Sequence, residues 1–140
     1  PGPTVGRQQI VEDRQGAGHT MIPFDADALR LLGETHEVHI RTDRHPGTAV
    51  VIWVVVADGA VFVRSFRGAK GRWYRDLAAG GPATVEVAGR RLAVQAVPVS
   101  EPAAVEQVSR AFLAKYASSP YAQAMVQPDI LSTTLRLDPR

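Results

Sequence analysis

The chain has 140 residues, of which 45% are hydrophobic and 21% are charged, a balance typical of one folded domain. Its longest apolar run, residues 49–57, is too short to be a membrane-spanning helix. The absence of cysteine excludes disulfides, thiolate metal sites, iron–sulfur clusters and a cysteine nucleophile. No basic region followed by an apolar core is visible at the N-terminus. We therefore expect a cytoplasmic protein with no membrane partner.

Positive charge is concentrated in one short segment. Five of the sixteen basic residues are Arg64, Arg67, Lys70, Arg72 and Arg75, while the rest of the chain carries eleven basic and fourteen acidic residues. A general nucleic-acid binder spreads its basic residues along a face, whereas one dense loop favours a compact anion such as phosphate. We therefore expect no nucleic-acid partner.

The first half of the chain predicts one helix followed by strands. We expect residues 1–20, which are polar and rich in glycine, to form a flexible lead to a domain spanning residues 21–140. A short helix is predicted from Asp25, its N-cap, to a stop at Gly33. Alternating and β-branched residues then predict three strands, at residues 37–42, 49–57 and 60–66. The second of these reads as a central strand covered on both faces, and Asp58-Gly59 after it favours a two-residue hairpin turn.

The second half predicts a mixture of helices and strands. Its expected elements are a basic loop at residues 67–71, helical turns at 72–79, a hairpin of 84–88 and 92–99 turning at Gly89-Arg90, a helix from Ser100 as cap, a turn at 121–126 and a last strand at 133–137. The helix is the best marked, with Pro102 in its first turn and an apolar stripe of Val105, Val108, Phe112 and Tyr116. This order predicts an α+β fold whose mainly antiparallel sheet forms a small barrel.

The segment from Val63 to Tyr74 is the strongest candidate for a ligand site. A predicted strand ends at Arg64 and Ser65, Gly68 and Gly71 allow a close approach of the backbone, and a helix begins just beyond them. Lys and Arg side chains would bind a phosphate as a point charge and as a planar fork. The alternative is a solvated basic loop with Trp73 and Leu77 packed in the core. Composition alone leaves both interpretations open.

This segment also carries a resemblance. From Val51 to Val87 the chain has a strand, an Asp-Gly hairpin, a strand ending in Ser65, the basic glycine loop, Trp73-Tyr74 and a Pro82-led strand. This arrangement resembles the FMN-binding split-barrel superfamily, which includes the pyridoxamine-phosphate oxidases, and within it the deazaflavin-dependent nitroreductases. The basic loop, the Trp-Tyr pair and the ending Thr133 to Leu137 are also similar to an uncharacterised bacterial domain family.

The resemblance implies a six-stranded, mainly antiparallel split β-barrel with flanking helices, assembled as a homodimer. It further implies a flavin cofactor, either FMN or an 8-hydroxy-5-deazaflavin coenzyme, with its phosphate in the basic loop. The residues that it places around the cofactor are Trp53, Val54, Ser65, Lys70, Gly71, Arg72, Trp73 and Tyr74, and the predicted strand end adds Arg64 as a ninth cofactor-binding candidate. The nitroreductases commonly carry Asn at the position of Asp76, and an acidic residue there would weaken a phosphate site unless it pairs with Arg72 one turn earlier.

The resulting hypothesis is an oxidoreductase that transfers a hydride to or from a small planar substrate. The cofactor would supply the redox chemistry, and the sequence identifies no catalytic acid or base. The alternative is a non-catalytic split-barrel carrier or sensor of a phosphate-bearing small molecule.

Histidines and tyrosines receive structural interpretations. His36 and His39 are three residues apart and so face opposite sides of a strand, and no acidic cluster completes a metal site with them or with His45. We therefore predict no metal site. Tyr116 and Tyr121 are expected to be core or dimer contacts rather than proton donors.

Overall fold

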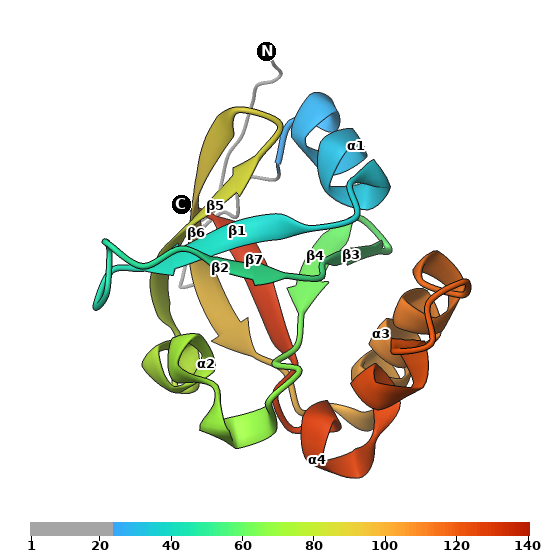
Figure 1. Cartoon of the computed structure of the whole chain (residues 1–140). Coiled ribbons are helices and arrows are strands. Elements are labelled where there is room, and N and C mark those ends of the chain that lie inside the picture. Colours follow the sequence, from blue (N-terminus) through green and yellow to red (C-terminus); the bar gives the residue numbers. More distant parts are fainter. Residues whose placement is uncertain (1–23) are drawn as a thin grey trace.

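The computed structural model describes residues 24–140, and within this range the chain forms an α+β fold (Figure 1). The predicted lead at residues 1–20 lies outside the described residues. The helical elements are α1 (Ala26–Glu34), α2 (Arg72–Leu77), α3 (Pro102–Lys115) and α4 (Pro128–Leu131), with 3-10 helices η1 (Gly68–Lys70) and η2 (Ala122–Val126). The strands are β1 (Val38–Thr42), β2 (Val50–Ile52), β3 (Val55–Ala57), β4 (Ala60–Val63), β5 (Gly81–Val87), β6 (Arg90–Pro98) and β7 (Leu135–Pro139). Over the described range no helix combines the length and the apolar character needed to span a bilayer.

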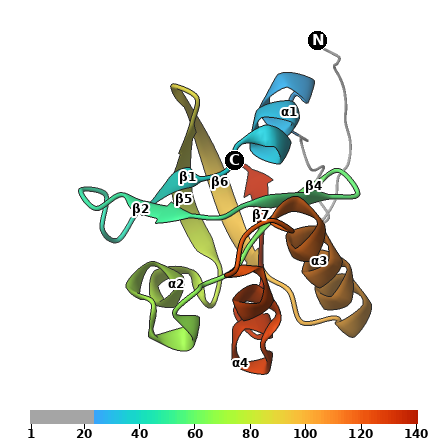
Figure 2. The ribbon, with the colours of Figure 1, turned by 45° about the vertical axis from the view of Figure 1, so that its right-hand side comes forward.

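All seven strands in this range belong to one antiparallel sheet, in the order β2-β1-β5-β6-β7-β4-β3. The sheet curls into a half-barrel, which Figures 1 and 2 show from two directions. Its strands β2 and β3 follow one another in the chain but occupy opposite edges of the sheet. The two edges are therefore joined directly by Trp53 and Val54.

This join corrects two predictions. Six strands were expected and seven are present, because the segment 49–57 is divided into β2 and β3 and neither is central. The cause lies outside the segment: the hydroxyl of Tyr116 accepts a hydrogen bond from the Val54 amide (3.2 Å) and donates to the His36 carbonyl (2.8 Å). The backbone at the break is thus satisfied by a side chain from the end of α3 rather than by a neighbouring strand.

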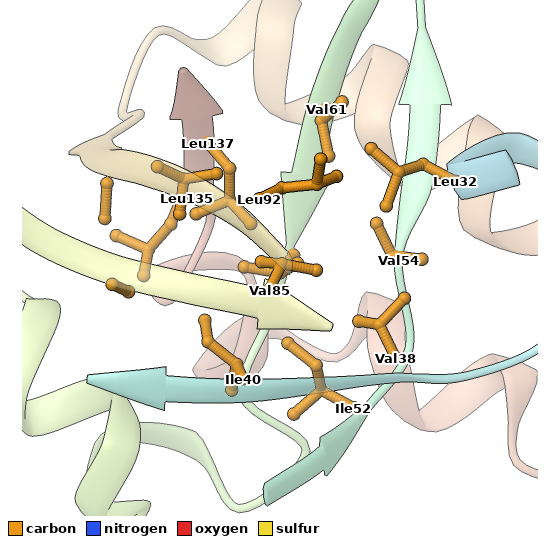
Figure 3. Close-up of a cluster of buried hydrophobic side chains, with 14 of the residues drawn as sticks. Leu32, Val38, Ile40, Ile52, Val54, Val61, Val85, Leu92, Leu135 and Leu137 are labelled. Carbon is orange, nitrogen blue, oxygen red and sulfur yellow. The ribbon is translucent and has the colours of Figure 1, made fainter. Parts of the chain in front are cut away.

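The hollow of the half-barrel contains the main core. Figure 3 shows side chains from β1, β2, β4, β5, β6 and β7 directed toward one another, with Leu32 of α1 at one side. Among them Ile40, Val85, Leu135 and Leu137 are fully buried. Burial of each such side chain stabilises the fold by about 1.5–3 kcal/mol, so the inner face of the sheet accounts for most of the apolar packing.

A second apolar cluster lies between the outer face of the sheet and α3. Val55 of β3 and Phe62 of β4 pack against Val108, Phe112 and Tyr116. The predicted helical stripe is confirmed for these three residues, which are buried. Ser100 is not the cap, however, because the helix begins after Glu101, whose side chain makes no capping hydrogen bond.

Turns were predicted with mixed success. Asp58 and Gly59 adopt φ values of 52° and 78°, which confirms the two-residue turn. The second hairpin turns one residue early, at Ala88 and Gly89. Asp25 caps α1 as expected, accepting a hydrogen bond from the Ala28 amide at 2.7 Å, but the helix continues through Gly33 to Glu34.

One strand is shorter than predicted and another is shifted toward the C-terminus. β4 ends at Val63 instead of residue 66, and β7 starts at Leu135 instead of residue 133. The hydroxyls of Thr133 and Thr134 donate to the carbonyls of Ile130 (2.6 Å) and Leu131 (2.7 Å) at the end of α4. These local side-chain bonds favour a turn over a strand.

Candidate functional site

A cavity of about 720 Å³ opens beside β2. Its walls come from β2 and the turn before it, the chain leaving β4, the start of α2, and the segment around η2. In both views α2 lies below β2 (Figures 1 and 2). A volume of this size falls within the range of small-molecule sites.

Part of the cavity lining is apolar and aromatic. Ile52, Trp53, Trp73 and Met125 belong to this part, which we call the aromatic wall. The Trp53 indole is held in place because it stacks on Tyr116, with ring centroids 3.8 Å apart and planes 3° from parallel. Such a wall suits a flat ring system.

Two arginines give the cavity a basic side. Arg67 and Arg72 both line it and are exposed to solvent. Within residues 24–140 neither guanidinium makes a hydrogen bond or an ion pair. Both side chains are therefore available to bind an anion such as phosphate.

Arg64 also reaches the cavity wall, but the fold uses most of its hydrogen-bonding capacity. The residue is only 1% exposed. Its guanidinium donates to the hydroxyls of Thr134 (2.8 Å) and Ser109 (2.9 Å) and to the carbonyls of Met125 (3.0 Å) and Val105 (2.8 Å). Burial lowers the pKa of Arg64 to about 10. Arg64 thus connects the end of β4 to α3, η2 and the start of β7.

Ser65 and Gly71 form a tight contact at the base of the basic segment. The Ser65 hydroxyl donates to the Gly68 carbonyl at 2.8 Å, and its amide donates to Thr133 Oγ1 at 3.0 Å. A Cβ atom at Gly71 would lie 2.6 Å from Ser65 Oγ. Glycine is therefore required at position 71 for the packing of the loop, and Ser65 itself faces inward.

Six of the nine residues proposed from the sequence meet at the cavity: Trp53, Arg64, Ser65, Gly71, Arg72 and Trp73. The other three lie outside its lining. Val54 is fully buried in the core, Tyr74 donates its hydroxyl to the Ser132 carbonyl at 3.2 Å, and Lys70 is an exposed residue at the end of η1.

The structure also brings to the cavity a polar group that the sequence interpretation missed. The sequence left open whether Asp76 pairs with Arg72; in the structure its Oδ2 atom accepts from the hydroxyl of Thr42 and contacts Nδ1 of His45, each at 2.7 Å. Burial opposes ionisation of Asp76, yet hydrogen bonds from Thr42 and His45 and the charges of His45 and Arg44 outweigh it and lower its pKa. No local pattern marks this cluster, since 31 residues separate His45 from Asp76.

His36 and Tyr116 pack against neighbouring aromatic rings, whereas Tyr121 is not the core residue that was one of its two predicted roles. His36 packs edge-on against Trp53, with centroids 5.8 Å apart. Tyr116 is a core residue as expected, and burial raises its pKa to about 12, which makes it a poor proton donor near neutral pH. Tyr121 is 62% exposed and packs edge-on against Phe66 at the rim of the cavity. In the described part of the chain, no three His, Asp or Glu side chains are grouped to hold a metal.

Comparison with known proteins defines the fold and the family. The structure is similar to the crystal structure of the conserved hypothetical protein Rv2991 from Mycobacterium tuberculosis, with a TM-score of 0.55 and 14% identity over 84% of this chain and 80% of that one. At this identity the likeness concerns the fold alone. No curated protein matches the sequence. Residues 28–137 match the family described as "Uncharacterized protein conserved in bacteria (DUF2255)". The chain therefore belongs to the bacterial DUF2255 family.

Proposed function

We propose that the cavity binds a flavin-type cofactor, FMN or an 8-hydroxy-5-deazaflavin coenzyme, and that the protein is an oxidoreductase acting on a small planar substrate. The observation that carries this proposal is the pairing of an aromatic wall with the two arginines Arg67 and Arg72 in one cavity. A phosphate-bearing planar molecule needs both features. The resemblance to split-barrel flavoproteins supports the same conclusion.

The residues present fit such a cofactor. Arg67 and Arg72 would hold the phosphate, since their guanidinium groups can donate two parallel hydrogen bonds to its oxygens. Ile52, Trp53 and Trp73 would contact the ring system and exclude water from one of its faces. Arg64 adds a buried cation whose hydrogen bonds, among the described residues, all go to neutral groups. Its charge is therefore not cancelled locally and favours an anionic ligand.

In this proposal the cofactor and the protein have different roles. The bound cofactor supplies the hydride chemistry, which no amino-acid side chain provides. The protein holds the ring against the aromatic wall, fixes the anionic end and limits access of water. Orientation of this kind is a large part of the rate enhancement in such reactions.

A non-catalytic function is the second candidate. Arg67 and Arg72 would bind a phosphate whatever group is attached to it, so the same cavity suits a carrier or sensor of a phosphate-bearing small molecule. The two functions differ in one measurable respect. An oxidoreductase must turn over its reduced cofactor with an acceptor, whereas a carrier binds without redox change.

The binding test compares three neighbouring cations. Purified protein is titrated with FMN and with the 8-hydroxy-5-deazaflavin coenzyme, and binding is followed by fluorescence and absorbance. Arg67→Ala and Arg72→Ala should each weaken binding by about tenfold or more, because a charge-assisted hydrogen bond contributes about 1.5–3 kcal/mol. Lys70→Ala is the matched control, since Lys70 lies in the same loop outside the cavity, and it should change affinity less than twofold.

Two results would overturn the proposal. One is the absence of binding of either cofactor to the wild-type protein. The other is an affinity that survives both arginine substitutions unchanged. Binding of the cofactor without turnover by any acceptor would favour the carrier.

A further inference from the structure

Asp76 connects α2 to the turn that follows β1. Its carboxylate reaches both Thr42 Oγ1 and His45 Nδ1 at 2.7 Å, and Thr42, His45 and Asp76 all line the cavity. The two partners differ in exposure: the Asp76 side chain is 8% exposed and that of His45 is 43% exposed. The carboxylate is thus enclosed while the imidazole remains accessible from the cavity.

The turn holds His45 in a defined place. Its amide donates to the Thr42 carbonyl (3.1 Å), and its carbonyl accepts from the Thr48 amide (3.1 Å). Backbone on both sides of the ring is therefore fixed independently of the contact with Asp76. A group held in this way does not have to be ordered when a ligand arrives.

The contact determines which ring nitrogen carries a hydrogen. An ionised carboxylate only accepts hydrogen bonds, and the pKa of Asp76 is lowered by its surroundings. His45 Nδ1 must then be the donor, so in the neutral ring Nε2 has a free lone pair. Within residues 24–140, Nε2 makes no hydrogen bond. The other charged residues lining the cavity are Glu37, Arg64, Arg67 and Arg72, and Arg44 lies close enough to act on the Asp76 carboxylate.

We propose that His45 exchanges a proton with the molecule bound in the cavity, and that Asp76 is the positioning residue that holds its Nδ1. This inference rests on the proposed function, because the cofactor is the source or acceptor of the hydride. If a substrate gained a hydride from a bound reduced cofactor, the doubly protonated ring of His45 would give its Nε2 proton to the atom that gains negative charge and keep the hydrogen on Nδ1. The substrate is then reduced by two electrons, the cofactor is oxidised by two, and His45 regains a proton from solvent. In the opposite direction His45 Nε2 accepts the proton.

The first test needs no ligand. Nitrogen-15 NMR of the imidazoles at alkaline pH distinguishes the two neutral tautomers, and His45→Gln assigns the signal among the four histidines. We expect His45 to carry its hydrogen on Nδ1 in the wild type and to lose this preference in Asp76→Asn. A hydrogen on Nε2 in the wild type, or an unchanged signal in Asp76→Asn, would overturn the dyad.

The second test measures whether His45 and Asp76 contribute to turnover. Oxidation of the reduced deazaflavin coenzyme by a planar quinone such as menadione is followed by absorbance. His45→Gln should lower kcat by about 100-fold, as expected for loss of a general acid, and Asp76→Asn by about tenfold, with cofactor affinity changed less than threefold. His39→Gln is the matched control, because His39 is exposed on β1 away from the cavity lining. If Asp76→Asn fails to fold, His45→Gln alone decides the result.

The outcomes separate this inference from the proposed function. Cofactor binding and turnover that both substitutions leave intact would overturn the role of His45 while preserving the proposed function. Failure of the wild-type protein to bind cofactor would overturn the proposed function and the proton transfer together, even where NMR shows the expected tautomer.

Discussion

The indole of Trp53 lies flat against the phenol ring of Tyr116, and the hydroxyl of the same tyrosine bonds to the backbone of Val54. One side chain at the end of α3 thus holds the two residues at which the sheet passes from one edge to the other. The same stack fixes one wall of the cavity. The cavity and the outer helix therefore share a structural element.

Removing the Tyr116 hydroxyl should destabilise the protein without opening the stack. In Tyr116→Phe the buried Val54 amide loses its partner, which costs about 1–3 kcal/mol. The free energy of unfolding is measured by urea denaturation. Tyr121→Phe is the control, because Tyr121 is exposed and its hydroxyl makes no hydrogen bond within residues 24–140. Equal stabilities of the two variants would contradict the role assigned to the hydroxyl.

Arg64 should behave as a structural residue in stability measurements. Arg64→Lys keeps the charge but cannot make four bonds in a fixed plane, so we expect a loss of at least about 2 kcal/mol in the free energy of unfolding. Arg67→Ala, three residues away and exposed, should change it by less than about 0.5 kcal/mol. An unchanged free energy of unfolding in Arg64→Lys would show that the four hydrogen bonds of Arg64 contribute little to stability.

The close contact between Gly71 and Ser65 predicts a rescue. A methyl group at position 71 would lie 2.6 Å from Ser65 Oγ, so Gly71→Ala should cost about 1–3 kcal/mol. Adding Ser65→Ala removes the clashing oxygen, and the double variant should be more stable than the sum of the single effects predicts. Thermal denaturation of the four proteins measures this coupling. Simple additivity would mean that the loop moves away from the new methyl group.

Lys115 is predicted to titrate within reach of ordinary buffers. Its ammonium donates to the carbonyls of Leu32 (3.0 Å) and Val54 (2.6 Å), and burial lowers its pKa from 10.5 to about 8. The chain has two lysines, so Lys70→Arg leaves one side-chain signal, which NMR should show titrating near pH 8.

The lowered pKa of Lys115 also fixes the sign of a stability effect. Between about pH 8 and 10.5 the unfolded state binds the proton more strongly than the folded state. This residue therefore makes the protein more stable as the pH rises through that interval. The free energy of unfolding of the wild type, relative to Lys115→Met, should increase from pH 8 to pH 10. A difference that stays constant or falls would contradict the burial of the charge.

Features that depend on neighbouring residues were predictable from the sequence. The turn at Asp58 and Gly59 follows from residue types that accept positive φ, and the stripe through Val108, Phe112 and Tyr116 follows from helical spacing. The concentration of charge before Trp73 likewise indicated the region of the cavity, since Arg72 and Trp73 both line it.

Features that depend on distant residues could not be read from the sequence. The apolar run of residues 49–57 has no Gly or Pro at the point where it breaks, and the break is stabilised by a tyrosine 62 residues away from Val54. His45 and Asp76 likewise belong to two different elements, and hydrophobic periodicity identifies each element without indicating that the two are in contact. Arg64 looked like a ligand residue because its sequence neighbours are cationic, whereas its burial is determined by α3 and η2.

The passage of the backbone from β2 to β3 has a consequence for the curvature of the sheet. With only Trp53 and Val54 between them, the first and last strands of the sheet order are tethered by a linker of two residues, so the sheet cannot flatten without breaking the pairing of one of them. A circularly permuted chain with its new ends between Trp53 and Val54 would lack this covalent link. If its sheet keeps the same curvature, the bend is intrinsic to the twisted strands. If the sheet flattens, the link imposes the bend.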